Sequence, residues 1–358
     1  MRSSTQSHEP GEEAQPQEMA ASKPTHPGVT VIVPVRNDAL RLERCLRSIL
    51  ATRHPSERLQ VIVADNGSTD QTPQVARALG ADVLSCPDVR VGAVRNQAAR
   101  AARGDVLVFI DADHEIQPDW IPLALEGLAQ PRAGAIGAPY TAPADGTWVQ
   151  QLYDSFRTRP TGVQEVDWLP SGNLAIWRSA FAALDGFDTS LETCEDVDFC
   201  QRLKRAGFVL LGDSRLRSVH YGDPLTLRAL FMGELWRGRD NLRVSWLGPL
   251  TLRALPSIVI PIAGLVLMIA AGIGLLTWPL GGANVVVAAA VGLLLLAALR
   301  VARMLRRTSS MGPITVVRSF AVALTYEIAR SLALVVRTPH GVRQASALPR
   351  AFPRDRRP

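Results

Sequence analysis

Short apolar runs alternate with amphipathic stretches over the N-terminal half of the chain. The runs are rich in β-branched residues and occupy positions 29–33, 61–63, 83–84 and 106–110. Between them, apolar side chains recur every three or four residues, as at Leu42, Cys45 and Ile49, which is the spacing of one helix face. Strands and helices in alternation predict an α/β fold with a central, mostly parallel sheet that is covered by helices.

A different pattern fills the C-terminal third of the chain. Residues 254–299 include no Asp, Glu, Lys or Arg. Within this region, 255–278 and 283–302 are each long enough to cross a bilayer, and a turn with one Pro and two Gly separates them. We therefore expect a transmembrane helical hairpin at 254–303. A hairpin buried in a soluble domain is the alternative.

The charge distribution gives this hairpin an orientation. The formal net charge is +6, and most of the basic excess follows position 200. Arginines crowd both outer ends of the hairpin and are absent from its turn, so the positive-inside rule places both ends in the cytoplasm. Basic residues beside an apolar segment favour membrane lipids over nucleic acid as partners. We expect a multi-pass protein of the cytoplasmic membrane whose α/β domain faces the cytoplasm.

Three other segments flank these two parts. Residues 1–27 are rich in Ser, Gln, Glu and Pro and lack the apolar core of a signal peptide, which predicts a disordered leader. Residues 223–253 mix large apolar residues with arginines, as an amphipathic interfacial helix does. Residues 304–358 hold a mostly apolar stretch and a basic tail. An interfacial helix is favoured there over a third membrane helix, which would place the tail outside. The α/β domain is expected at 28–222.

Acidic residues follow several of the predicted strands. Ligands of such sheets bind at the C-terminal ends of the strands. Asp38 and Asp65 follow the first two strands, and Asp111 and Asp113 come directly after the fourth. Asp38 could simply cap a helix. Asp111 and Asp113, only one residue apart, would repel each other unless a cation or another partner lay between them, which points to a metal site.

Further short motifs continue this pattern in a fixed order. They are 31–38 (VIVPVRND), 61–70 (VIVADNGSTD), Arg95-Asn96, Asp111-Ala112-Asp113, Ser171-Gly172-Asn173, Glu195-Asp196 and His220. Each is weak alone, but in this order they resemble family 2 glycosyltransferases of the GT-A fold, of the membrane-anchored bacterial type. The resemblance covers about residues 29–220. One departure is Arg36, where the family usually has Tyr.

The resemblance implies a nucleotide-sugar donor. The residues expected to bind it are Pro34, Arg36, Asp38, Asp65, Arg90, Arg95, Asp111, Gly172 and Asn173. Asp65 is expected to contact the nucleotide base. Arg90 and Arg95 are expected to contact phosphate, with a solvated helix face as the alternative. Gly172 either allows the donor or acceptor sugar to approach the backbone closely, or only forms a turn.

The resemblance also implies a divalent cation, because the diphosphate of the donor leaves with negative charge. Asp113 would hold the ion, with Asp111 assisting through water, and His220 matches a histidine that completes the metal site in many GT-A enzymes. Oxygen ligands suit Mg²⁺ or Mn²⁺, and an imidazole would favour Mn²⁺. His220 could instead be a partly buried histidine at a strand end.

An acceptor hydroxyl is a poor nucleophile, so a carboxylate must take its proton as the sugar carbon is attacked. Asp196 of the Glu195-Asp196 motif is the predicted base. It also opens a helix, so the alternative is an N-cap, and a helix N-terminus is expected to lower its pKa. The family inverts the anomeric centre in one step, which implies one essential base and no covalent intermediate.

These features favour transfer of one sugar to a lipid-linked or membrane-proximal glycan acceptor, in glycan or cell-envelope polysaccharide biosynthesis. Processive synthases carry a Q-x-x-R-W motif, whereas the corresponding stretch here, 234–239, reads ELWRGR. A polyprenyl-phosphate sugar synthase is an alternative, although a phosphate acceptor has less need of a base. A non-catalytic membrane scaffold that keeps the nucleotide fold is the second alternative.

Overall fold

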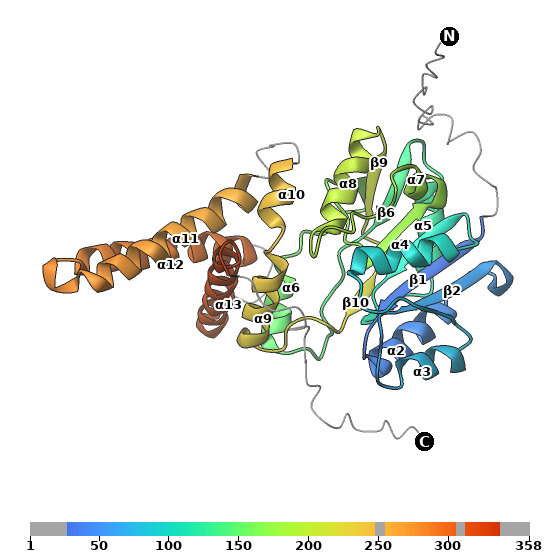
Figure 1. Ribbon diagram of the computed structural model, residues 1–358, viewed down its shortest axis with the longest axis horizontal. Helices are drawn as coiled ribbons and strands as arrows, with labels where there is room; N and C mark the ends of the chain where they lie inside the picture. Colours follow the sequence, from blue (N-terminus) through green and yellow to red (C-terminus); the bar gives the residue numbers. More distant parts are fainter. Residues whose placement is uncertain (1–26, 248–254, 306–311, 337–358) are drawn as a thin grey trace, which may run out of the picture.

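The computed structural model describes residues 27–247, 255–305 and 312–336. Most of the expected leader and the basic tail after residue 336 lie outside these residues. Figure 1 shows an α/β domain on one side and a long helical hairpin that extends away from it, with further helices at the base of the hairpin.

An eight-stranded sheet forms the centre of the α/β domain. Its strands are β1 (Val29–Val35), β2 (Leu59–Asp65), β3 (Asp82–Ser85), β4 (Val106–Ile110), β6 (Ala133–Gly137), β7 (Val163–Glu165), β8 (Asn173–Trp177) and β9 (Val209–Asp213). They are ordered β3-β2-β1-β4-β8-β6-β9-β7. Strands β1 to β4 are all parallel, whereas β8 is antiparallel to both β4 and β6. The predicted α/β fold with a mostly parallel sheet is confirmed.

Helices cover this sheet, and the central strands are therefore apolar along their whole length. The helices are α2 (Ala39–Leu50), α3 (Thr72–Ala78), α4 (Val91–Ala101), α5 (Trp120–Leu128), α7 (Arg178–Ala183) and α8 (Glu195–Arg205), with a short 3₁₀ turn, η1 (Ser56–Arg58). All five residues of β4 are buried. The ring of Phe109 packs 5.3 Å from Phe181 and 5.4 Å from Phe187, measured between centroids.

A second, two-stranded sheet brings a late part of the chain to the end of β4. Strand β5 (His114–Ile116) pairs antiparallel with β10 (Ser218–His220), and the register places His220 opposite His114. Because β5 begins three residues after Asp111, this pairing fixes a histidine beside the two acids that follow β4. The antiparallel β8 similarly brings the loop before Asn173 to the end of β4, where Ile110 pairs with Asn173.

The remaining helices form a separate helical part of the molecule. They are α6 (Trp148–Asp154), α9 (Leu227–Arg237), α10 (Asn241–Leu247), α11 (Leu255–Leu276), α12 (Ala283–Leu305) and α13 (Pro313–Leu332), with a 3₁₀ turn, η2 (Trp278–Leu280), between α11 and α12. Helices α11 and α12 are long and apolar enough to cross a membrane, and only 22% and 17% of their most apolar windows is buried inside the protein. Such exposed apolar surface does not fit a hairpin buried in a soluble domain.

Helix α13 lies at the base of the hairpin, in contact with α9, α11, α12 and α6 (Figure 1). Two of its three charged side chains turn inward, while Arg318 is exposed: Glu327 accepts a hydrogen bond from Arg300 of α12 at 2.5 Å, and Arg330 donates one to Asn241 of α10 at 3.0 Å. Its outer side carries exposed apolar residues, among them Ile314 and Val317. An inward polar face and an outward apolar face are the arrangement expected of a helix against a membrane.

The expected single amphipathic helix at 223–253 is instead two helices, α9 and α10, so this prediction needs correction. The chain turns between them at 238–240, where Asp240 faces the α/β domain. Its Oδ2 accepts hydrogen bonds from the backbone N–H groups of Glu192 at 2.9 Å and Thr193 at 3.1 Å. Helix α9 is also packed against α13, with Leu235 buried between them. A continuous helix could not place Asp240 in this contact.

Candidate active site

Arg95 joins two of the predicted acidic motifs. One guanidinium nitrogen donates to Asp111 Oδ1 at 2.6 Å and another to Glu195 Oε1 at 2.7 Å. The side chain is only 3% exposed. Asp111, at the end of β4, keeps 37% of its side chain exposed. Arg95 thus neutralises two carboxylates from distant parts of the chain and holds them at one edge of the sheet.

The glycine loop closes over Asp111. A Cβ at Gly172 would lie 2.4 Å from Asp111 Oδ2, so glycine is required there by close approach to this carboxylate. Ser171 donates its hydroxyl to Glu195 Oε1 at 3.1 Å. Asn173 begins β8 and is fully buried, and its amide donates to the carbonyl of Ala138 at 2.7 Å. Asn173 therefore anchors the loop from within the sheet.

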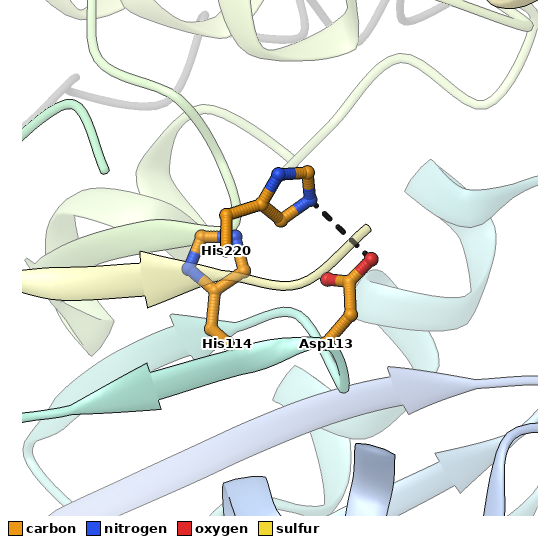
Figure 2. Close-up of side chains that lie close together, drawn as sticks. All are labelled: Asp113, His114 and His220. Carbon is orange, nitrogen blue, oxygen red and sulfur yellow. Dashed lines mark ion pairs between the residues drawn. The ribbon is translucent and has the colours of Figure 1, made fainter. Parts of the chain in front are cut away.

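Asp113 and His220 form a second group, which Figure 2 shows at the β5–β10 pair. His220 Nε2 lies 3.3 Å from Asp113 Oδ2, and His220 Nδ1 lies 2.7 Å from Asp223 Oδ1. Burial opposes the charged form of each group. The attraction between His220 and its two carboxylates outweighs burial, so the pKa of His220 is raised well above its ordinary value and that of Asp113 is held well below.

His114 completes this group in space, although the sequence analysis did not single it out. Ligand atoms of Asp113, His114 and His220 all lie within 4.8 Å of one another. The ring of His114 packs 4.8 Å from that of His220, and its Nδ1 is buried without a hydrogen-bond partner. Burial and the charge of His220 lower the pKa of His114 to about 4, so it is neutral near pH 7. A neutral buried imidazole is able to bind a metal.

These residues fit a divalent cation. The 3.3 Å between Asp113 Oδ2 and His220 Nε2 is close to the separation of two adjacent ligands whose bonds to one ion are about 2.1 Å long. Gly222 leaves space beside the carboxylate of Asp113, because a Cβ at position 222 would lie 1.8 Å from Asp113 Oδ2. Asp111 is not part of this group, since its Oδ1 is paired with Arg95.

Asp196 occupies the second position of α8, next to Glu195. The N-cap of this helix is Cys194, in the left-handed conformation with φ 62°, so Asp196 does not cap it. Its Oδ1 accepts a hydrogen bond from the N–H of Val197 at 2.8 Å, and its Oδ2 lies 3.5 Å from the N–H of Ser171. Burial and the charge of Glu195 raise the pKa of Asp196 to about 7. The expected lowering by the helix N-terminus is therefore wrong, because both of these effects outweigh it.

Residues of the predicted nucleotide loop lie at the ends of β1 and β2. Asp65 is 7% exposed, and its two oxygens accept from the N–H of Ser68 at 3.2 and 3.3 Å. Pro34 lies in β1 beyond Ile32, the last residue paired with β4, so its missing N–H breaks no ladder on that side. Asp38 is at the N-cap position of α2 without capping it.

The charged residues of this region are paired. Asp38 accepts a hydrogen bond from Arg41 Nε at 2.7 Å, and burial raises the pKa of Asp38 despite that partner. Arg36 lies 3.3 Å from Asp88 at the surface. Arg90 donates to the carbonyl of Ser190 at 2.6 Å. Arg90 and Arg95 thus both pair with groups of the protein itself. To bind phosphate, either side chain would have to give up such a contact.

Three contributors to the site escaped sequence analysis: His114, Gly222 and Asp223. His114 directly follows Asp113, and Asp223 comes three residues after His220, so both lie next to motifs that the sequence does show. The signal that identifies them is the pairing of β5 with β10, which a single sequence does not reveal. Gly222 is explained only by the closeness of Asp113.

Comparison with known proteins agrees with this geometry. The model of Glycosyl transferase family 2 matches residues 30–184. The chain is 27% identical over 248 residues to the glycosyltransferase AglE of Haloferax volcanii, which covers 64% of this chain and 78% of AglE. It is 25% identical over 281 residues to the succinoglycan biosynthesis protein ExoA of Rhizobium meliloti, covering 73% of this chain and 82% of ExoA.

The fold also has a solved counterpart. The mannosyltransferase PcManGT from Pyrobaculum calidifontis, in complex with GDP-Man and Mn²⁺, superposes with a TM-score of 0.55 at 19% identity, over 87% of this chain and 92% of that one. The likeness covers both the sheet domain and much of the helical part. The family match shows a glycosyltransferase family 2 domain over residues 30–184, which transfers a sugar from a nucleotide-sugar donor, and the structural likeness shows that its fold is of the GT-A type.

Proposed function

We propose that the protein is an inverting, metal-dependent glycosyltransferase that moves one sugar to a hydroxyl of a lipid-linked or membrane-proximal acceptor, in glycan or cell-envelope biosynthesis. The observation that carries this proposal is the carboxyl of Asp196, whose pKa is about 7 and which lies beside the Ser171-Gly172 loop over Asp111. A carboxyl of this kind is suited to accept a proton from a hydroxyl near neutral pH.

Asp113 and His220 would hold the cation, with His114 and Asp111 nearby. When bound, a divalent ion stabilises the negative charge that develops on the leaving diphosphate. The imidazole of His220 favours Mn²⁺ over Mg²⁺ at this site. PcManGT, whose fold is similar, was solved with Mn²⁺. Asp113 is ionised beside His220, as a ligand must be, and a bound cation would take the place of the proton that His220 otherwise carries on Nε2.

The donor would lie along the ends of β1, β2 and β4. Asp65 is proposed to contact the nucleotide base, with Pro34, Arg36 and Asp38 forming the loop beside it. Arg95 is proposed to organise Asp111 and Glu195 rather than to bind phosphate, because both of its hydrogen-bonding ends are occupied. This revises the role expected of Arg95 from sequence.

In the proposed reaction, the acceptor oxygen attacks the anomeric carbon of the donor sugar from the side opposite the diphosphate. The new carbon–oxygen bond forms as the bond to the diphosphate breaks, and the nucleoside diphosphate leaves with the electron pair. Asp196 takes the hydroxyl proton. Glu195 stays paired with Arg95 and keeps its charge next to Asp196, which maintains the high pKa of the base.

Helices α11, α12 and α13 support the proposal that the acceptor is membrane-bound. Helices α11 and α12 could span the bilayer, and the arginines at their outer ends favour a cytoplasmic position for the α/β domain. Helix α13 turns exposed Ile314 and Val317 outward, as expected of a helix in the interface. We place the protein in the cytoplasmic membrane as a multi-pass enzyme.

A panel of nucleotide-sugars, incubated with the purified full chain in detergent, tests the proposal. We expect release of the nucleoside diphosphate from one donor class in the presence of Mn²⁺ or Mg²⁺, and loss of release when a chelator is added. Activity that persists in chelator would contradict the metal assignment. Transfer to polyprenyl phosphate that survives Asp196→Asn would favour the synthase alternative instead.

A further inference from the structure

We propose that Asp223 is a positioning residue for His220, and that Arg157 in turn fixes Asp223. Together they hold the imidazole in the tautomer and orientation that a divalent cation at Asp113 needs. The inference rests on the proposed metal-dependent function, and it names the residues that tune the affinity of that site for the ion.

The first step is the geometry of the imidazole. His220 Nδ1 lies 2.7 Å from Asp223 Oδ1, and Nε2 lies 3.3 Å from Asp113 Oδ2. A carboxylate at Nδ1 keeps a proton on that nitrogen, so the lone pair of a metal-binding imidazole is on Nε2, the side that faces Asp113. A carboxylate behind a ligating histidine also raises the basicity of the ligand.

The second step is the confinement of Asp223. Its side chain is fully buried, and both of its oxygens accept hydrogen bonds from Arg157, at 2.8 and 2.5 Å. Asp223 therefore has a fixed orientation, and it cannot turn away from His220 without breaking both hydrogen bonds that it accepts from Arg157.

The third step is the support of Arg157. Its guanidinium lies over the ring of Tyr140, 4.2 Å from the centroid, and donates to Asp154 at 2.8 Å. The ring of Tyr140 packs in turn on His220, 4.4 Å between centroids. Arg157 thus holds the histidine from two sides, through Asp223 at the ring nitrogen and through Tyr140 at the ring face.

The fourth step is where this support is anchored. Asp154 is the last residue of α6, whose Val149 and Leu152 belong to the same apolar cluster as Val301 of α12 and Val322 of α13. The outer support of the metal site is therefore built onto the C-terminal helices. A buried ion pair contributes little net stability, so this arrangement is better explained by the orientation it imposes.

The test measures Mn²⁺ binding by the full chain in detergent, without donor, from the electron paramagnetic resonance signal of free Mn²⁺. Asp223→Asn keeps the shape of the side chain but removes its charge. We expect its Mn²⁺ affinity to fall about 10-fold or more, in the range found for changes behind a ligating histidine. Asp213→Asn is the matched control, because Asp213 is also fully buried and paired with an arginine, Arg215 at 2.8 Å, but is not part of the support of His220, and we expect a change of less than about twofold.

His220→Ala separates this inference from the metal assignment itself. If His220→Ala binds Mn²⁺ as the unaltered chain does, the proposed metal site is wrong and the inference fails with it. If His220→Ala loses Mn²⁺ while Asp223→Asn binds normally, the metal site stands and only the role of Asp223 is overturned. Equal losses in Asp223→Asn and Asp213→Asn would also overturn it, since they would show a general effect of removing a buried carboxylate.

A second variant keeps the inference testable if Asp223→Asn does not fold. Arg157→Lys retains a cation next to Asp223 but cannot pair with both of its oxygens. We expect it to melt within a few degrees of the unaltered chain and to bind Mn²⁺ several-fold more weakly. Mn²⁺ affinity equal to that of the unaltered chain in a folded Arg157→Lys would contradict the second step of the argument.

Discussion

Replacing Asp196 by Asn should make the protein more stable and much less active. The two effects have one cause, which is the burial of a carboxyl next to Glu195. In the folded protein the pKa of Asp196 is raised from 3.8 to about 7, first by burial and then by the charge of Glu195. Asn has nearly the same shape and carries no charge, so it avoids the free-energy cost of burying an ionised carboxylate next to Glu195.

The size of the gain follows from the shift. Between about pH 4 and about pH 7 the folded protein holds a proton that the unfolded chain has released, so the stability of the unaltered protein falls as the pH rises through this window. A shift of this size corresponds to roughly 4 kcal/mol, and partial exposure to water reduces the expected gain in Asp196→Asn to about 2 to 4 kcal/mol near pH 8. Below about pH 3, where Asp196 is protonated in both the folded and the unfolded state, the gain should nearly vanish.

The loss of activity has the opposite sign and a different pH dependence. A positioned general base contributes roughly 10² to 10⁴ in rate, so turnover of Asp196→Asn should fall by that factor. Donor affinity should stay nearly constant, because Asp196 acts on the acceptor hydroxyl. In the unaltered enzyme, kcat/KM should rise with pH through about 7 as Asp196 ionises, and this rise should be absent from the variant.

Thermal melting at pH 5 and pH 8, donor binding and turnover together test this reasoning. Asp198→Asn is the matched control: Asp198 lies in the same first turn of α8 and pairs with Arg202 at 2.8 Å, so its loss should cost under about 1 kcal/mol and leave turnover intact. If Asp196→Asn turns over within a few fold of the unaltered enzyme, the base is Glu195 or Asp198. If it melts lower at pH 8, the account of its burial is refuted.

Three further outcomes are expected. Asp113→Asn should abolish both transfer and metal-dependent nucleotide binding with little change in melting temperature, and normal nucleotide binding in the presence of Mn²⁺ would contradict its role. Gly172→Ala should lower activity at least about 10-fold, because its Cβ would lie 2.4 Å from Asp111 Oδ2 and must displace that carboxylate; wild-type kinetics would show that the loop can yield. Labels at Gly282 and near Arg354 should be accessible from opposite sides of the membrane, and equal labelling would reject the two-span topology.

The sequence was sufficient for the sheet and for most of the acids. Fully apolar strands such as β4 are recognisable without a structure, because a parallel sheet that is covered on both faces leaves no polar position along them. Asp111 and Asp113 follow directly from the end of that strand. The hairpin could also be predicted from the sequence, since its lack of charged residues is a property of composition alone.

What could not be predicted depends on contacts between distant segments. The pKa of Asp196 is set by burial and by Glu195, and this outweighs the helix position from which its direction was inferred. Arg95 was taken for a phosphate ligand, but the fold places it between Asp111 and Glu195. The break between α9 and α10 is fixed by hydrogen bonds that Asp240 accepts from a loop nearly 50 residues earlier in the chain. The burial of Asp196 and the contacts of Arg95 and Asp240 have no local signature in the sequence.

That break has a mechanical consequence. The loop held by Asp240 leads directly into Glu195 and Asp196, while the next residue, Asn241, donates a hydrogen bond to the carbonyl of Ser257 in α11 at 2.8 Å. Two adjacent residues thus tie the proposed base to the first helix of the hairpin. A tilt of the hairpin, as bilayers of different thickness would impose, should reach Asp196 before it reaches Asp65 at the far end of the donor site. The thickness of the lipid should then alter the KM for the acceptor and leave donor affinity unchanged.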